Sequence, residues 1–306
     1  MNHYIEFSKL LYKIYDEKDI ELNSPMNEHI YFKVGGPADI LLTPRKKVQV
    51  VETIKLCKEN NIPYIIIGNG SNLLVKDGGI RGVVIKISNI KDITVDGESI
   101  TADCGALLAD VSKTALEYSL KGFEFACGIP GSVGGAVFMN AGAYDGEISY
   151  IVESVEVIND KQEIITLEKQ ELNLGYRTSA IMEKGFIVLS ATFSLQKGDY
   201  NQIKDRIEEL TKKREEKQPL EYPSAGSTFK RPPGHFAGKL IQDAGLKGFT
   251  LGGAAVSEKH SGFVINKNRA TAEDILNLIA HIQKTVKEKF DVELTPEVRI
   301  LGEDKK

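Results

Sequence analysis

The sequence predicts an α+β fold, and three observations support this class. Amphipathic helical runs alternate with strand-like runs over the first 125 residues, and a β-hairpin signal lies among them. Residues 151–195 are mostly strand-like. A charged helical segment over residues 201–217 then leads into a final part that mixes helices and strands. Since the chain has 306 residues, it is long enough for two or three domains, and we expect a break near residue 200.

Hydrophobic periodicity defines the elements before residue 125. Apolar residues at helical spacing, with charges between them, predict helices over residues 46–60 and 107–120. Uninterrupted apolar runs predict buried strands over residues 63–67 and 83–88. The dipeptide Asp96-Gly97, which lies between two short β-type runs, is a strong signal for a hairpin.

The same reasoning covers the second half of the chain. Residues 272–290 form the clearest helix, because Thr271 and Asp274 make a capping box in front of a long amphipathic run. Residues 292–301 predict a closing strand. The other predicted elements are strands over residues 152–158, 163–167, 186–195 and 262–266 and helices over residues 201–217 and 235–246.

Composition excludes several classes of protein. The net charge of −4 leaves no broad basic field for nucleic-acid phosphates. Cys57, Cys104 and Cys127 are an odd number without metal-ligand spacing, so we expect neither a metal site nor a disulfide framework. No apolar run has the length of a membrane span or a signal peptide. We therefore expect a soluble cytoplasmic protein that binds neither nucleic acid nor a membrane.

Two glycine-rich turns are candidates for holding phosphate. They are Gly-Asn-Gly-Ser-Asn at residues 68–72 and Gly-Ile-Pro-Gly-Ser-Val-Gly-Gly-Ala at residues 128–136. In such turns bare backbone N–H groups can close on phosphate oxygens. The first turn is not a dinucleotide-fold fingerprint, because loop or strand rather than helix follows it from Leu73 onward. Two small-residue turns together indicate an extended ligand with a pyrophosphate.

A third motif, residues 223–230, has the sequence Pro-Ser-Ala-Gly-Ser-Thr-Phe-Lys. With it, six motifs resemble, in their order along the chain, those of the UDP-N-acetylenolpyruvoylglucosamine reductase family. The resemblance extends from about Phe32 to Gly302. The six motifs lie at residues 32–39, 68–72, 128–136, 176–179, 223–230 and 296–299.

The resemblance implies both a fold and an activity. The fold is a vanillyl-alcohol-oxidase-type (PCMH-type) FAD-binding fold of two subdomains, residues 1–90 and 91–200, plus a C-terminal α+β substrate-binding domain, residues 201–306. The activity is that of an FAD-dependent oxidoreductase, a UDP-N-acetylmuramate dehydrogenase. With NADPH as co-substrate, it reduces UDP-N-acetylglucosamine enolpyruvate to UDP-N-acetylmuramate for peptidoglycan synthesis, and so serves cell wall biogenesis, cell shape and cell division. We expect a monomer with non-covalent FAD, since no covalent attachment residue is evident.

The resemblance assigns three catalytic residues, Arg177, Ser227 and Glu297. In the family's reaction, hydride transfer to C3 of the enolpyruvyl ether leaves negative charge at C2 and on the carboxylate. Arg177 would grip that carboxylate bidentately, with Glu297 as a second partner there. Ser227 would donate the proton to C2. Lys230 has two candidate roles, stabilising developing alkoxide on Ser227 or binding the UDP phosphates.

Binding residues follow from the same motifs. Arg214 and Lys217 also fit a solvated helix face, which is the alternative interpretation for both. The predicted FAD contacts are Asn69, Gly70, Ser71, Asn72, Leu73, Gly131, Ser132, Gly135 and Ala136. The predicted substrate contacts are Tyr144, Arg214, Lys217, Lys230 and Arg299.

The chain departs from some family members in one respect, and two alternative functions stay open. Some family members carry an inserted segment with a tyrosine that closes over substrate, whereas here the strand at Phe186 begins nine residues after Arg177. The chain therefore resembles the shorter branch. The alternatives are an FAD-dependent oxidase or dehydrogenase of hydroxy acids and a non-catalytic nucleotide-sugar sensor.

Overall fold

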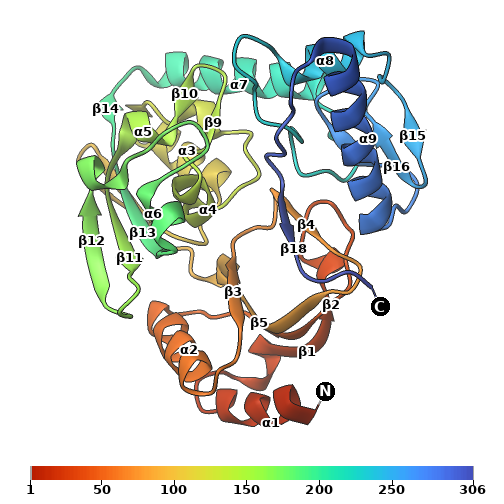
Figure 1. The fold of residues 1–306 in the computed structure, drawn as a ribbon. Helices are drawn as coiled ribbons and strands as arrows, with labels where there is room; N and C mark the ends of the chain where they lie inside the picture. Colours follow the sequence, from red (N-terminus) through yellow and green to blue (C-terminus); the bar gives the residue numbers. More distant parts are fainter. Residues whose placement is uncertain (1, 306) are drawn as a thin grey trace. The chain divides into compact units, whose positions relative to one another are not determined.

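The computed structural model describes residues 2–305 (Figure 1). Contacts divide the chain into two compact units whose segments alternate along the sequence. The first unit comprises Met1–Leu22, Ile40–Asn69 and Gly82–Arg214, and the second comprises Asn23–Asp39, Gly70–Arg81 and Glu215–Lys306. The functional division at residues 90 and 200 stays a prediction. No helix within residues 2–305 is long and apolar enough to cross a membrane.

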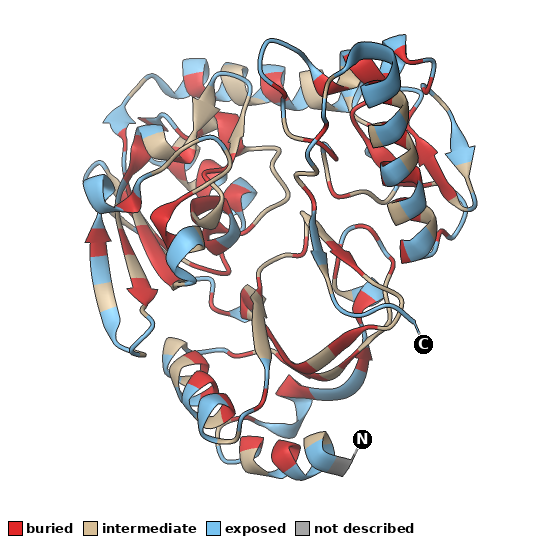
Figure 2. Ribbon diagram, in the orientation of Figure 1, coloured by how far each residue is buried: buried red, intermediate tan, exposed pale blue. Residues whose placement is uncertain are grey.

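A five-stranded antiparallel sheet forms a large part of the first unit, with the strand order β12-β11-β13-β7-β6 (Figure 1). The predicted hairpin at Asp96-Gly97 is confirmed, and Gly97 has the positive φ of +59° that such a turn favours. The central β13 is buried along most of its length, whereas β12 at the edge is mostly exposed (Figure 2). The strands are β6 (Ile93–Asp96), β7 (Ser99–Asp103), β11 (Val152–Ile158), β12 (Ile164–Glu168) and β13 (Ile187–Ser194).

A four-stranded sheet has the order β1-β2-β5-β3, and β3 and β5 pair in parallel. The division between the two units falls within three of these strands, β1, β2 and β5. The strands are β1 (Ile20–Pro25), β2 (Pro37–Leu42), β3 (Tyr64–Ile67) and β5 (Ile80–Lys86).

Seven helices of the described chain begin in the first unit. The helix predicted over residues 107–120 is too long. Ser119 takes a left-handed φ of 54°, and Leu120 lies in a short strand. This strand, β8 (Leu120–Lys121), pairs with β14 (Gln196–Lys197). Helices α1 and α4 to α6 were not predicted. The helices are α1 (Asn2–Leu11), α2 (Lys47–Glu59), α3 (Leu108–Glu117), α4 (Val133–Phe138), α5 (Ile148–Ile151), α6 (Ala180–Lys184) and α7 (Tyr200–Lys217), and a small hairpin joins β9 (Gly142–Ala143) to β10 (Gly146–Glu147).

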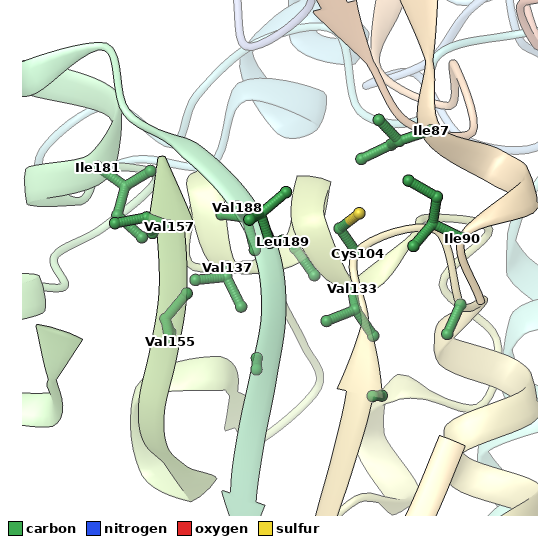
Figure 3. Close-up of a cluster of buried hydrophobic side chains, with 14 of the residues drawn as sticks. Ile87, Ile90, Cys104, Val133, Val137, Val155, Val157, Ile181, Val188 and Leu189 are labelled. Atoms are coloured by element: carbon green, nitrogen blue, oxygen red, sulfur yellow. The ribbon is translucent and has the colours of Figure 1, made fainter. Parts of the chain in front are cut away.

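The buried apolar residues of both sheets and of α1 to α4 form one continuous core in the first unit. Figure 3 shows Val133 and Val137 of α4 near Val188 and Leu189 of β13 and Cys104. These side chains are at most 4% exposed. The core therefore anchors α4, the helix that directly follows the second glycine turn.

The second unit contains a three-stranded antiparallel sheet, β15 (Thr250–Leu251), β16 (Ala254–Val256) and β17 (Val264–Asn266), together with helices α8 (Ala237–Asp243) and α9 (Ala272–Phe290). The predicted bounds of α9 and its capping box are confirmed. The Oγ1 of Thr271 accepts from the backbone N of Asp274 at 3.0 Å, and an Asp274 carboxylate oxygen accepts from the Thr271 N at 3.0 Å.

Two predictions for this part of the chain are wrong in extent. The strand predicted over 292–301 is limited to β18 (Arg299–Leu301), which pairs in parallel with β4 (Leu73–Val75). Of the residues before it, Pro296 makes only an isolated antiparallel bridge, to Phe229. The helix predicted over 235–246 is shorter, since Gly245 takes a φ of +82° just after α8 ends.

Candidate functional site

The first two glycine-rich turns meet within the first unit. The side-chain amide of Asn69 donates a 2.7 Å hydrogen bond to the carbonyl of Pro130, 61 residues along the chain. A Cβ added at Gly68 would overlap the Oγ of Ser132, so a side chain there would displace the serine hydroxyl. The structure thus brings together Asn69 and Ser132, two predicted FAD contacts.

The hydroxyl of Ser132 provides a test of whether this place fits FAD. Ser132 is 1% exposed, and its Oγ has no hydrogen-bond partner among residues 2–305. It occupies the N-cap position of α4 but makes no side-chain capping bond there. A buried hydroxyl left without a partner costs about 1–3 kcal/mol. A polar ligand would supply the missing partner, so these residues fit the phosphate-bearing part of FAD.

The remaining predicted FAD contacts of the second turn lie at the start of α4. The carbonyl of Gly131 accepts from the backbone N of Leu108 at 3.0 Å, which ties the turn to α3. The motif does not stay a turn throughout, since α4 begins at Val133. Gly135 is therefore a helical residue with an exposed face, and Ala136 is buried.

Gly70 and Ser71, which complete the first turn, belong to the second unit. Gly70 has a φ of +70°, and a Cβ added to it would lie 2.5 Å from the carbonyl oxygen of His29. Both the conformation and the close approach therefore require glycine at this position. Ser71 is half-buried.

Arg177 lies in the first unit in a loop before α6. Its Nη1 donates to the carbonyl of Asn140 at 3.3 Å, and its Nη2 donates to the carbonyl of Gly142 at 3.1 Å. The guanidinium carbon lies 5.2 Å from the ring centroid of Tyr176. Arg177 also takes a left-handed φ of 57°, a conformation that costs a non-glycine residue about 1–2 kcal/mol and is enriched at functional sites. The loop therefore holds the guanidinium in a defined direction.

Two residues that support this loop were missed by sequence reasoning. Asn140 is fully buried, and its amide donates to the carbonyl of Gly175 at 3.0 Å. Ser179 is also fully buried; its hydroxyl donates to the Phe138 carbonyl at 2.6 Å and accepts from the Met182 N at 3.1 Å. A serine directly before a helical run is a capping signal that could have identified Ser179. Nothing local in the sequence marks Asn140.

Two predicted substrate contacts of the first unit lie near α7. The hydroxyl of Tyr144 donates to the carbonyl of Leu210 at 3.1 Å, although the side chain is 45% exposed. Arg214 is half-buried, and its side chain lies against Gly128. Lys217 ends α7, is exposed and belongs to the second unit.

The two predicted catalytic residues of the second unit lie on paired segments. The backbone N of Glu297 donates to the carbonyl of Thr228 at 2.8 Å, and the N of Lys230 donates to the carbonyl of Thr295 at 2.9 Å. This antiparallel pairing brings the segment after Ser227 alongside the segment that carries Glu297. Ser227 is exposed, whereas Glu297 and Lys230 are half-buried. A hydroxyl and a carboxylate from distant parts of the sequence thus share one region.

Thr228 anchors this region to the interior. Its side chain is 2% exposed, and its hydroxyl accepts from the backbone N of Val264 at 2.9 Å. Its backbone N donates to the carbonyl of Gly262, also at 2.9 Å. The exposed Ser227 is therefore held in place by the next residue, which is buried and hydrogen-bonded through both its side chain and its backbone.

Asn72, Leu73 and Arg299 lie beside the same segment. Leu73 of β4 is opposite Arg299 of β18 in the parallel pair, and the Arg299 N donates to the carbonyl of Asn72 at 3.0 Å. The side-chain amide of Asn72 donates to the carbonyl of Glu297 at 3.2 Å. The second unit thus groups Asn72, predicted to contact FAD, with predicted catalytic and substrate-binding residues.

Comparisons with known proteins agree with these motifs. A family model described as "UDP-N-acetylenolpyruvoylglucosamine reductase, C-terminal domain" matches residues 218–301, and one described as "FAD binding domain" matches residues 38–168. UDP-N-acetylenolpyruvoylglucosamine reductases of Clostridium perfringens and Clostridium beijerinckii are each 66% identical to this chain over 304 residues, covering 99% of it and 100% of the relative.

Solved structures agree as well. The crystal structure of UDP-N-acetylenolpyruvylglucosamine reductase from Thermus caldophilus is 34% identical, with a TM-score of 0.79 over 92% of this chain and 97% of that one. The glucose dehydrogenase Phl p 4.0202 is 15% identical with a TM-score of 0.50, and it covers 64% of this chain and 44% of its own. That second likeness concerns the fold alone. The predicted FAD-binding fold of the vanillyl-alcohol-oxidase type is confirmed.

Proposed function

Since the chain belongs to the UDP-N-acetylenolpyruvoylglucosamine reductase family, we propose that it reduces UDP-N-acetylenolpyruvoylglucosamine to UDP-N-acetylmuramate with NADPH and bound FAD. This is an oxidoreductase reaction of peptidoglycan synthesis. The observation that supports it most directly is the pairing of the Ser227 and Glu297 segments, because it groups a hydroxyl and a carboxylate suited to proton transfer.

The glycine turns would hold the cofactor. Ser132 would offer its buried hydroxyl to the pyrophosphate, and the backbone around Gly131 and Gly135 allows close approach. Asn69 would fix the first turn against the second. When bound, FAD supplies the hydride that the substrate receives.

Arg177 would bind the carboxylate of the enolpyruvyl group. A guanidinium keeps its positive charge at all relevant pH values and offers two parallel N–H donors to a carboxylate. Its attachment to the carbonyls of Asn140 and Gly142 places the charge before the substrate arrives. A preorganised cation of this kind stabilises the negative charge that develops on the carboxylate during reduction.

Ser227 would donate the proton to C2, and Glu297 would be the second partner at the carboxylate. A serine hydroxyl is a weak acid, so a nearby cation is needed to stabilise the developing alkoxide. Lys230, three residues further along, is our candidate for that role, and phosphate binding is the competing one. By their match to the family motifs, Tyr144, Arg214, Lys217 and Arg299 would contact the nucleotide-sugar.

We extend the proposal to the location, partners and domains of the enzyme. The enzyme would be a cytoplasmic monomer without nucleic-acid or membrane partners. The net charge of −4 supports the absence of a nucleic-acid partner. Residues 1–90 and 91–200 would be the two FAD-binding subdomains and residues 201–306 the substrate-binding domain, with Tyr144 and Arg177 of the second subdomain also contacting substrate. The short connection after Arg177 has no room for a tyrosine segment, so other residues would exclude water.

The test separates the two half-reactions under anaerobic conditions. We expect Ser227→Ala to leave the reduction of the enzyme by NADPH unchanged and to slow its reoxidation by substrate about 10²- to 10⁴-fold, because a general acid contributes about that much. Ser224→Ala, in the same motif, is the matched control and should leave both steps at parental rates. Parental rates for Ser227→Ala in both steps would refute the role of Ser227. NADPH consumption that does not depend on the enolpyruvyl sugar would refute the substrate.

A further inference from the structure

We propose that Gly128 is a positioning residue for Arg214, and that the space left by its missing side chain is needed for tight binding of the nucleotide-sugar. A Cβ added at Gly128 would lie 2.7 Å from the Cδ of Arg214 and 3.5 Å from its Nε and Nη1. Contacts under 3.0 Å require something to shift. The inference rests on the proposed function, which gives Arg214 a contact with the substrate.

Space rather than backbone conformation requires glycine at this position. Gly128 is not among the glycines with positive φ, so alanine can adopt its backbone angles. The atom in closest approach is Cδ, which lies in the stem of the arginine and not at its tip. Relief of the collision therefore needs a different rotamer, and a change of rotamer in the stem displaces the whole guanidinium.

Helix α7 cannot easily move away, because residues on both sides of the glycine hold it. The Oγ1 of Thr211 and the carbonyl of Ile207 lie 3.8 and 3.9 Å from the Sγ of Cys127. One turn before Arg214, the carbonyl of Leu210 accepts from the Tyr144 hydroxyl at 3.1 Å. Leu210 itself is only 2% exposed. These contacts hold α7 beside residues 127 and 128, so we expect the arginine side chain rather than the helix to absorb the change.

The consequence concerns binding of an anionic ligand. A guanidinium recognises a phosphate through a planar pair of N–H donors, so its direction matters as much as its charge. The bond from Tyr144 to Leu210 supports the helical turn before Arg214, and Gly128 leaves room for the arginine stem. Gly128 acts through Arg214 and needs no contact with the substrate itself.

A double-mutant cycle tests the inference. We expect Gly128→Ala to raise the KM for the enolpyruvyl sugar about 10- to 100-fold, which is the loss of a hydrogen bond to a charged group. The loss should fall on KM rather than on kcat. A Gly128→Ala protein that is purified with less bound FAD than the parent would overturn the inference, because the substitution would then act on the cofactor turn rather than through Arg214. Arg214→Ala should raise the KM similarly. In the Arg214→Ala background the collision is absent, so Gly128→Ala should have no further effect.

Each outcome decides one question. A parental KM for Gly128→Ala, or losses that add in the double variant, would overturn the inference about Gly128 while leaving the proposed function intact. A parental KM for Arg214→Ala would remove Arg214 from the substrate site and overturn the inference with it. If Gly128→Ala folds poorly, the double variant still tests the inference. A urea midpoint of the double variant equal to that of Arg214→Ala would support a collision between the two side chains. A midpoint below that of Arg214→Ala would overturn it.

Discussion

Replacing Ser179 by alanine should destabilise the first unit strongly for so small a change. The serine is fully buried, and its hydroxyl makes two hydrogen bonds, to the Phe138 carbonyl and from the Met182 N. Losing the N-cap of α6 costs about 1 kcal/mol. Losing the donor to the Phe138 carbonyl costs about 1–3 kcal/mol. We therefore expect Ser179→Ala to lower the free energy of unfolding by about 2–4 kcal/mol.

Ser112 provides a matched control with the opposite expectation. It is 2% exposed and lies inside α3, and within the described residues its hydroxyl has no hydrogen-bond partner. Alanine removes that unsatisfied group and has the higher helix propensity, by about 0.5 kcal/mol. We expect Ser112→Ala to leave the free energy of unfolding unchanged or to raise it.

Both variants are compared by urea denaturation followed by circular dichroism at 222 nm, together with kcat/KM for the enolpyruvyl sugar. Because Ser179 holds the loop that carries Arg177, we also expect Ser179→Ala to lower kcat/KM while the NADPH half-reaction is unaffected. A Ser179→Ala protein that unfolds within about 0.5 kcal/mol of the parent would refute the reasoning from buried hydrogen bonds. Equal losses in the two variants would do the same, since burial alone would then explain them.

Two further predictions follow from perturbed pKa values. Hydrogen bonds, first from the backbone N of Gly253, lower the pKa of Asp274 below its ordinary 3.8. The parent should therefore be more stable than Asp274→Asn by its full margin above pH 3.8, and this margin should disappear as the pH falls through the lower pKa of Asp274 in the folded protein. Urea midpoints of both proteins at several pH values measure the margin. A margin that does not change with pH would contradict this. Burial raises the pKa of Cys57 and of Cys104 to about 12, whereas Cys127 is only half-buried. Iodoacetamide at pH 8 should thus label Cys127 first and the other two after unfolding, and mass spectrometry finding Cys104 labelled in the folded protein would refute this.

Local signals in the sequence predicted those elements whose determinants lie within a few residues of one another. The capping box at Thr271 and Asp274 marks the start of α9, and Asp96-Gly97 marks the β6–β7 hairpin. The resemblance to a family likewise depends on short motifs and named the candidate residues. None of these inferences needed knowledge of what packs against what.

Tertiary structure alone decided the elements that depend on distant partners. Helix α4 contains two glycines and has poor helix propensity, but Val133 and Val137 are buried in the core of the first unit. Strand β18 forms only where residues 299–301 pair in parallel with β4, a segment from a distant part of the sequence.

The site shows the same division. The sequence identified Ser227, Glu297, Asn69 and Ser132. It did not show that the segment of Ser227 pairs with that of Glu297, or that the turn of Asn69 contacts the turn of Ser132. Such contacts form only when folding has closed the intervening loops, and loop closure leaves no periodic pattern along the chain. For this reason the sequence by itself determined which residues are candidates, and the tertiary structure decided which of them lie together.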